Sequence, residues 1–183
     1  MNGQRQLRAA ARQLAGDLKE RDLQIVLAES CTAGLVAATL GGIPGVSAFL
    51  CGSSVVYQSD TKSQWLGIPR SLLENPGPVS KEVAMEMAKR ALAKTPKADV
   101  AVSVTGHLGP DAPKAQDGLI FAAVALRARP GRRAQECLLM RRVQLSESES
   151  GSLSPARIRA RRQSAAARFV LDFAHDVITR HAR

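Results

Sequence analysis

Residues 24–42 read "QIVLAESCTAGLVAATLGG" and pass from apolar residues into small residues through a serine. The apolar run at 24–28 predicts a buried strand, and the small residues at 32–40 predict a helix. "GGIPG" at 41–45 then ends that helix, because Gly and Pro interrupt regular structure. A strand that leads directly into a helix is the repeating unit of an α/β sheet. Ser30 lies at the joint between the two.

The same alternation continues along the chain. Helices are predicted over 4–21, 61–67 and 81–94 and from Pro155 onward, and strands over 49–57, 98–106, 119–128 and 135–145. Ser80 is a good N-cap for the third of these helices. Strands follow one another near the end, so we predict a three-layer α/β/α domain with a mixed, mostly parallel sheet. A chain of 183 residues fits a single domain, residues 1–183.

Composition limits the function classes. Three cysteines without C-x-x-C spacing indicate neither a disulfide framework nor a zinc site, so we expect no metal and no cofactor. The first 22 residues have no apolar core of a signal peptide. No apolar run approaches the length of about 18 residues that a membrane span needs. We therefore expect a cytoplasmic protein without a membrane partner.

The formal charge of +10 raises the question of a nucleic-acid partner. Many arginines lie in two stretches, 127–142 and 156–163. Neither stretch has interleaved aromatic residues, and no nucleic-acid-binding signature occurs in the chain. We expect most of these arginines to form a solvated face and do not expect a nucleic-acid partner. A basic surface also suits a smaller anion such as a nucleotide phosphate.

Ser30 has two interpretations. A serine between a strand and a helix is an ordinary N-cap, and position alone favours that interpretation. The alternative is a nucleophile beside unpaired backbone N–H groups, which needs a base. His107 is the only histidine near plausible chemistry, and Lys62 offers an amine whose pKa would fall on burial. Taken alone, Tyr57 fits an interfacial tyrosine and Lys62 a surface lysine.

Three hydroxyl residues fall at or just beyond predicted strand ends: Ser30, Tyr57 and Thr105. Ligands of α/β sheets bind beyond the carboxyl ends of the strands. If these strands are parallel, the three side chains emerge at one edge of the sheet. This convergence favours the functional interpretation of each residue over its separate structural one.

Three ordered motifs resemble the CinA C-terminal domain family. They are "AESCTAG" at 28–34, "GSSVVYQSDTK" at 52–62 and "GPVSKEVA" at 77–84, and the similarity spans roughly residues 5–180. The deamidase members of that family are nicotinamide mononucleotide amidohydrolases. The resemblance implies an acyl transfer in which Ser30 attacks the carboxamide carbon and Tyr57 and Lys62 are its activating partners. Backbone N–H groups near Cys31–Ala33 are then candidates for the oxyanion hole.

The resemblance also implies the substrate contacts. The expected substrate-binding residues are Glu29, Thr32, Gly34, Thr105, Gly106, His107, Arg157 and Arg161. The two arginines match positions at the start of the family's last helix and are expected to face a phosphate. The implied partner is a small-molecule nucleotide substrate, and the implied assembly is a homo-oligomer. The chain resembles the stand-alone deamidase, without the molybdopterin-binding-like domain of full-length CinA.

One loop departs from the family. Residues 106–118 read "GHLGPDAPKAQDG", whereas the family loop commonly reads G-I-A-G-P, several glycines and K-P-V-G. A loop with fewer glycines cannot bring its backbone as close to a phosphate. The alternative hypothesis is therefore a CinA-like module that binds a nucleotide or a partner protein and has no deamidase activity.

Overall fold

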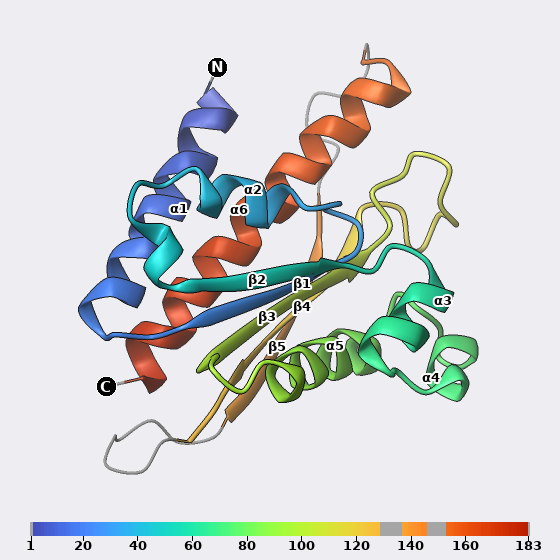
Figure 1. Cartoon of the computed structure of the whole chain (residues 1–183). Coiled ribbons are helices and arrows are strands. Elements are labelled where there is room, and N and C mark those ends of the chain that lie inside the picture. Colours follow the sequence, from blue (N-terminus) through green and yellow to red (C-terminus); the bar gives the residue numbers. More distant parts are fainter. Residues whose placement is uncertain (1, 129–136, 146–152, 183) are drawn as a thin grey trace.

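A computed structural model describes residues 2–128, 137–145 and 153–182. Its centre is a five-stranded sheet in the order β2-β1-β3-β4-β5 (Figure 1). The strands are β1 (Ile25–Glu29), β2 (Leu50–Val55), β3 (Val100–Gly106), β4 (Leu119–Leu126) and β5 (Cys137–Gln144). β1 pairs in parallel with both β2 and β3, and β4 is antiparallel to β3 and β5. The predicted α/β fold with a mixed sheet is confirmed.

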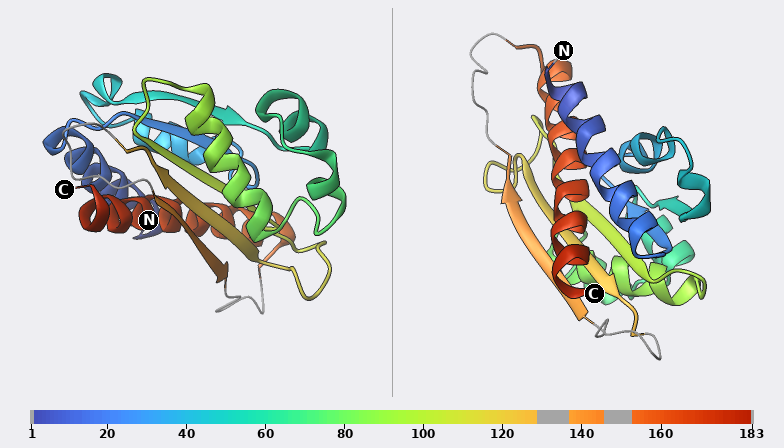
Figure 2. Two further views of the ribbon diagram at one scale, coloured as in Figure 1. Left: turned by 90° about the horizontal axis from the view of Figure 1, so that it is seen from below. Right: turned by 90° about the vertical axis from the view of Figure 1, so that its left-hand side faces the viewer.

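Helices cover both faces of the sheet (Figure 2). They are α1 (Asn2–Glu20), α2 (Leu35–Gly41), α3 (Ser59–Thr61), α4 (Arg70–Glu74), α5 (Lys81–Lys94) and α6 (Pro155–His181), with short turns η1 (Val46–Ala48) and η2 (Lys62–Leu66). α1 packs along α6, and both lie with α2 on one face. α5 covers the other face and contacts α4 and η2. No helix within the described ranges is long and apolar enough to cross a membrane.

Alternating side chains of the central strands build two cores. Ile25 and Leu27 of β1 face the core shared with α1, α2 and α6, whereas Val26 and Ala28 face the core shared with α5. Successive side chains of a strand point to opposite faces, so a sheet covered on both sides needs apolar residues at every position. β1 and nearly all of β3 are accordingly buried throughout.

The helix predicted for 32–40 begins later than expected, at Leu35. Residues 31–34 form a turn, with Ala33 and Gly34 at φ 51° and φ 92°. The carboxylate of Glu29 accepts the N–H groups of Gly34, Val36 and Ala37 from below this turn. Ser30 is therefore not the N-cap of α2. The capping interpretation that its position favoured is wrong, because a buried carboxylate pairs with the first N–H groups instead.

Other predicted boundaries agree within a few residues. The N-cap at Ser80 is confirmed, since its hydroxyl accepts the Val83 N–H at 3.3 Å. α6 begins at Pro155 as predicted. The sequence "RPGRR" also predicts a turn at 129–133 and "SESESGS" a polar loop at 146–152, and both segments lie outside the described residues.

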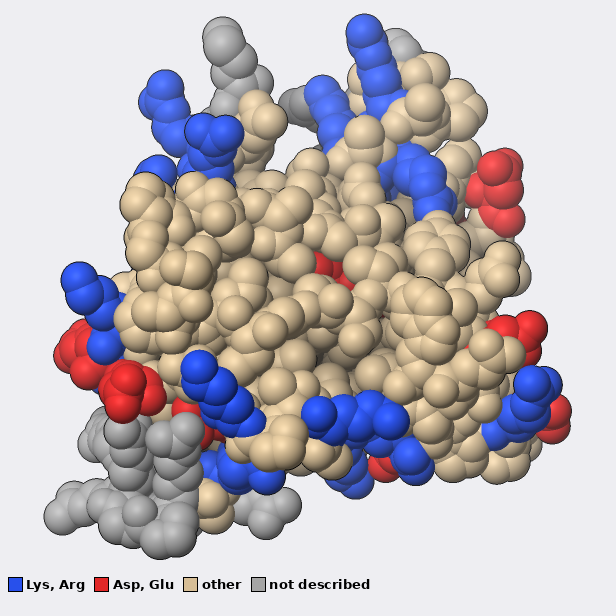
Figure 3. All heavy atoms as spheres, in the orientation of Figure 1, with Lys and Arg blue, Asp and Glu red and all other residues tan. Residues whose placement is uncertain are grey.

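Charged side chains on the face shown in Figure 3 lie mainly around its border. The middle of that face is mostly uncharged, and the described Lys and Arg residues on it form separate groups. This face therefore offers no single basic surface within the described residues.

Candidate functional site

A cavity of about 400 Å³ opens at the carboxyl ends of β1 and β3. Its lining residues are Ser30, Cys31, Tyr57, Gln58, Ser59, Lys62, Pro78, Val79, Thr105, Gly106, His107, Leu108, Gly109, Asp111, Ala112 and Arg159. They come from the ends of two parallel strands, the segment after β2, the turn before α5, the β3–β4 loop and α6. The convergence of Ser30, Tyr57 and Thr105 that the strand ends predicted is present.

Ser30 follows β1 directly and is 5% exposed. Its backbone N–H donates to the Val104 carbonyl at 3.0 Å, which extends the β1–β3 pairing by one residue. The side chain thereby points into the cavity rather than along the sheet. Within the part of the chain that the structure describes, the N–H groups of Cys31 and Thr32 donate to no backbone carbonyl. These two amides are suitable donors for an oxyanion formed next to Ser30.

Lys62 lies under Ser30 and is 1% exposed. Its Nζ is 2.8 Å from Ser30 Oγ, 2.9 Å from the Val56 carbonyl and 3.1 Å from the Tyr57 carbonyl. The backbone turn between β2 and η2 fixes this position, because the Lys62 N–H donates to the Gln58 carbonyl at 3.1 Å. The sequence predicted that the Ser30 hydroxyl, the Lys62 amine and the Tyr57 phenol meet in one cleft, and the structure shows the contact of the first two.

The three contacts of Nζ define what a neutral Lys62 can do. A neutral amine has two N–H donors and one lone pair. The two carbonyls are acceptors only, so they take the two donors and leave the lone pair for the Ser30 hydroxyl proton. Burial lowers the Lys62 pKa from its ordinary 10.5 to about 8, opposed by the nearby Cys31 thiol. About one lysine in ten is then neutral at pH 7.

Cys31 is a second candidate nucleophile at the cavity. Burial raises the pKa of its thiol to about 12, with weaker opposing effects from its own backbone N–H and from Lys62. The thiolate is the reactive form of cysteine, and it is essentially absent at neutral pH here. Ser30 is therefore the better nucleophile of the two.

Tyr57 stands at the mouth of the cavity and is 49% exposed. Its phenol oxygen accepts a hydrogen bond from Arg159 and makes none with Ser30 or Lys62. The contribution of Tyr57 to the buried pair comes through its backbone carbonyl, which accepts from Lys62 Nζ and, when Lys62 is protonated, also from Ser30 Oγ at 3.4 Å. The structure thus separates the tyrosine side chain from the serine–lysine pair.

Three of the expected substrate contacts lie beneath the cavity instead of in its lining. Glu29 is buried and accepts the Thr32 hydroxyl at 2.7 Å as well as the amides of α2. Thr32 is 0% exposed, and Gly34 supplies the left-handed residue before α2. These residues hold the Ser30 turn in place, and none of them lines the cavity.

The expected residues of the β3–β4 segment do line the cavity. The Thr105 hydroxyl donates to the Pro78 carbonyl at 2.8 Å and joins the end of β3 to the turn before α5. Gly106 lies so close to β4 that a Cβ would come within 2.6 Å of Ile120 Cγ2. The His107 N–H then donates to the Leu119 carbonyl at 2.9 Å, which starts the loop.

The arginines at the cavity differ from the expected pair. Arg157 and Arg161 are exposed on α6 and do not line the cavity. Arg159 lines it and donates to the Gly109 carbonyl at 3.1 Å and to the Tyr57 phenol. Arg162 is 4% exposed and contacts the β3–β4 loop from behind. Sequence reasoning missed both residues.

A signal for these two arginines was present in the helix pattern. The apolar stripe of α6 runs through Ala166 and Val170. Steps of four and then three residues backward from Ala166 reach Arg162 and then Arg159. Extending the stripe in this way would have put these two arginines, and not Arg157 and Arg161, on the face that meets the sheet.

The structure is an α/β protein with a buried serine–lysine pair at the carboxyl ends of its parallel strands. The profile of the CinA C-terminal domain matches residues 7–150, and the chain belongs to that family. A CinA-like protein of Dictyoglomus thermophilum is 39% identical over 112 residues, 60% of this chain and 27% of the relative. Another from Geobacter metallireducens is 42% identical over 109 residues, 58% of this chain and 26% of the relative. The chain therefore matches about a quarter of the length of these relatives.

Solved structures agree with the fold. The competence/damage inducible protein CihA from Agrobacterium tumefaciens is 29% identical, with a TM-score of 0.79, 92% of this chain covered and 93% of the other. The competence damage-inducible protein A from Klebsiella pneumoniae is 22% identical, with a TM-score of 0.80 and coverage of 94% and 97%. At 22% identity, the similarity to the Klebsiella pneumoniae structure supports the fold only.

Proposed function

We propose that this chain is an amidohydrolase that converts nicotinamide mononucleotide and water into nicotinic acid mononucleotide and ammonia. The observation that carries the proposal is the 2.8 Å contact between Lys62 Nζ and Ser30 Oγ at the base of a 400 Å³ cavity. Family membership supports the choice of substrate, since the family includes nicotinamide mononucleotide amidohydrolases. The cavity has the size of an ordinary small-molecule site.

In the first half-reaction, Ser30 Oγ attacks the carboxamide carbon while neutral Lys62 takes the hydroxyl proton. The amides of Cys31 and Thr32 are placed to stabilise the oxyanion that forms. The Lys62 ammonium then gives its proton to the leaving nitrogen, so ammonia departs and an acyl ester on Ser30 remains. In the second half-reaction, Lys62 takes a proton from water, and the resulting hydroxide equivalent cleaves the ester. The Lys62 ammonium gives its proton to the departing Ser30 oxygen, which restores serine and neutral lysine.

The substrate's other groups suit the rest of the cavity. Arg159 lies at the mouth and uses two of its five N–H donors in the contacts described, with the remainder able to meet a phosphate. No step requires Tyr57 to carry a proton, because Lys62 is already in contact with the nucleophile. Tyr57 is placed to contact the substrate at the rim.

The test is ammonia release from nicotinamide mononucleotide at pH 8.5 by wild type, Ser30→Ala and Lys62→Met. We expect each substitution to lower kcat by at least about 10³-fold, since the two residues act as one unit. Ser71→Ala, an exposed serine on α4, is the matched control and should behave as wild type. Wild-type release at background, with the nucleotide still bound in calorimetry, would favour the binding-module hypothesis.

A further inference from the structure

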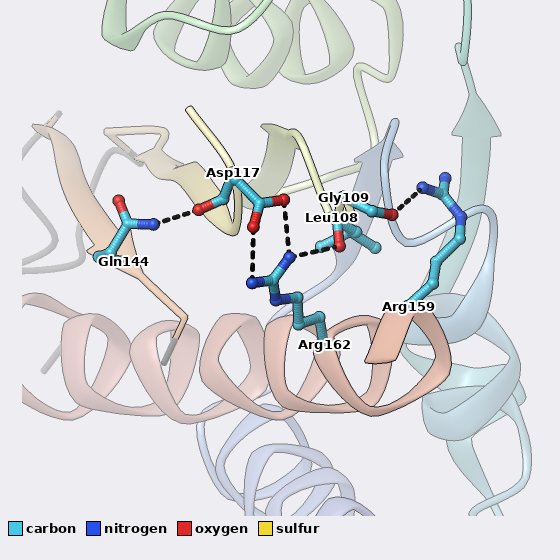
Figure 4. A network of polar contacts seen from close by, with 6 residues as sticks. All are labelled: Leu108, Gly109, Asp117, Gln144, Arg159 and Arg162. Carbon is cyan, nitrogen blue, oxygen red and sulfur yellow. Dashed lines mark hydrogen bonds and ion pairs between the residues drawn. The ribbon is translucent and has the colours of Figure 1, made fainter. Parts of the chain in front are cut away.

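Buried Arg162 and partly buried Asp117 form an ion pair at the β3–β4 loop (Figure 4), and neither residue lines the cavity. Arg162 Nη1 and Nη2 each donate to one carboxylate oxygen of Asp117, both at 2.8 Å. Arg162 Nη1 also donates to the Leu108 carbonyl at 3.1 Å. A planar guanidinium that binds a carboxylate with two parallel hydrogen bonds fixes direction as well as distance.

The three bonds of Arg162 reach both arms of the loop. Leu108 belongs to the arm that leaves β3, and Asp117 belongs to the arm that returns to β4. One side chain on α6 therefore ties the two arms together. The Asp117 carbonyl accepts from Gln144, so β5 holds the returning arm from its other side.

The loop backbone leaves space for this pair at two glycines. A Cβ on Gly109 would overlap Asp117 Oδ1 and Arg162 Nη1. A Cβ on Gly118 would lie 3.4 Å from Arg162 Cζ and 2.7 Å from the Leu145 carbonyl. Both glycines have positive φ, 61° and 74°. Side chains at positions 109 and 118 would therefore collide with the ion pair or crowd it, so this backbone path of the loop fits the ion pair only with glycine at both positions.

The arm held by Arg162 is also a wall of the cavity. His107, Leu108, Gly109 and Asp111 line the cavity, whereas neither Asp117 nor Arg162 does. Arg159, one helical turn before Arg162, holds the same arm through the Gly109 carbonyl. A change at the ion pair would therefore move the wall without touching Ser30 or Lys62.

We propose that Arg162 and Asp117 are positioning residues that set the distance of the β3–β4 loop from the serine–lysine pair, and so set how tightly substrate is held. The inference rests on the proposed function for its consequence in KM. The effect of the pair on the position of the loop does not depend on the proposed reaction. Breaking the pair raises KM and leaves the reactivity of Ser30 unchanged.

The test compares wild type with Asp117→Asn and with the double variant Arg162→Met/Asp117→Leu. The double variant replaces the pair by apolar residues, which commonly preserves folding where a single change leaves a buried charge unpaired. Asp172→Asn is the matched control, because Asp172 pairs with Arg168 at 3.5 Å on the same helix in partly exposed positions. Four quantities are measured: KM, kcat, the labelling rate of Ser30 by a small fluorophosphonate and amide hydrogen exchange of residues 107–118.

We expect both test variants to raise KM about tenfold, equivalent to about 1.4 kcal/mol, with kcat and Ser30 labelling within about twofold of wild type. Exchange in the loop should accelerate at least tenfold, and the control should match wild type throughout. Unchanged KM and unchanged exchange in folded variants would overturn the proposal. A parallel loss of labelling would also overturn it, since the pair would then act on the nucleophile.

Failure of the proposed function is distinguishable from failure of this inference. If wild type releases no ammonia, the hydrolase assignment is refuted. Amide hydrogen exchange of the loop and the dissociation constant of nicotinamide mononucleotide can be measured without turnover, so they still test the positioning role of the ion pair. Variants with wild-type values of both quantities would refute that role.

Discussion

At the scale of single residues, the distinguishing feature is a lysine buried with its amine against a serine. Burying an ammonium is costly unless the charge is compensated, and lysine responds by releasing its proton at a lower pH. The oxygens that Nζ of Lys62 contacts are two backbone carbonyls and the Ser30 hydroxyl, none of which carries a charge. Its lowered pKa, about 8, is the property that a general base needs near neutral pH.

Tyr57→Phe tests whether the phenol takes part in proton transfer. Because the phenol bonds to Arg159 and not to Ser30, we expect kcat to stay within about threefold of wild type and KM to rise severalfold. Steady-state kinetics at pH 8.5 separate the two constants. Loss of a general acid or base is expected to lower kcat by about a hundredfold or more. A fall of that size would show that the phenol transfers a proton.

The sequence predicted these residues unevenly. Ser30, Lys62 and Thr105 follow from strand ends and from three ordered motifs, so their meeting was predictable. The role of Glu29 was not, because the family resemblance implied only a substrate contact for it. The fold shows four of its acceptor contacts directed to residues 32–37. The inward-facing arginines were missed because four arginines between 157 and 162 give no direction without the helix phase.

At the scale of elements, α2 is a seven-residue helix that depends on Glu29 for its beginning. Short isolated helices are unstable, and unpaired N–H groups at a buried helix start are costly. The carboxylate supplies these groups with acceptors and at the same time fixes the turn that carries Ser30. Local stability and site geometry therefore depend on the same residue.

Glu29→Gln is expected to lower the free energy of unfolding by about 2 kcal/mol, since charge-assisted hydrogen bonds from three backbone amides lose their charge. Urea unfolding at pH 7.5 measures it. Glu74→Gln, on the exposed side of α4, is the control and should change stability by less than about 0.5 kcal/mol. A Glu29→Gln protein as stable as wild type would mean that the carboxylate does not anchor α2.

The end of the β3–β4 hairpin is the second element that positions the site. Gly106 faces β4 with Leu119 O and Ile120 Cγ2 each 2.6 Å from where a Cβ would stand. The two strands approach this closely only because residue 106 has no side chain. The loop that walls the cavity begins at this contact.

Gly106→Ala should therefore destabilise the fold by about 2 kcal/mol, because a methyl group is forced into a packed site. Gly16→Ala should instead stabilise the fold. Nothing lies within 4 Å of the added Cβ, and alanine is favoured over glycine in the middle of α1 by about 1 kcal/mol. Thermal unfolding of the two variants should move in opposite directions. Equal shifts would show that the close contact at Gly106 relaxes without cost.

At the scale of the whole molecule, α6 connects the cavity to the far end of the fold. Its first turns hold the β3–β4 loop through Arg159 and Arg162, and its last turns pair His175 with Asp17 of α1. The layer order, the mixed sheet and most element boundaries could be predicted, because burial on both faces leaves a clear pattern in the strands. The start of α2 could not, since it depends on the Glu29 side chain folding back onto backbone N–H groups within residues 34–37, which helix propensity does not reveal.

Stability as a function of pH tests the buried lysine in the whole fold. Between pH 8 and 10.5 the unfolded chain keeps the Lys62 proton while the folded chain has released it. Folding is therefore favoured by raising the pH through that window. Relative to Lys62→Met, wild type should gain about 3 kcal/mol from pH 7.5 to 10.5, measured by urea unfolding of both proteins. Parallel curves for the two proteins would contradict a lowered pKa.

The most direct measurement is the pH dependence of kcat/KM for nicotinamide mononucleotide hydrolysis between pH 6 and 9.5. A neutral Lys62 that takes the Ser30 proton predicts a tenfold rise per pH unit below about 8 and a plateau above it. A profile that stays level across the range, or one that falls as the pH passes 8, would contradict the account.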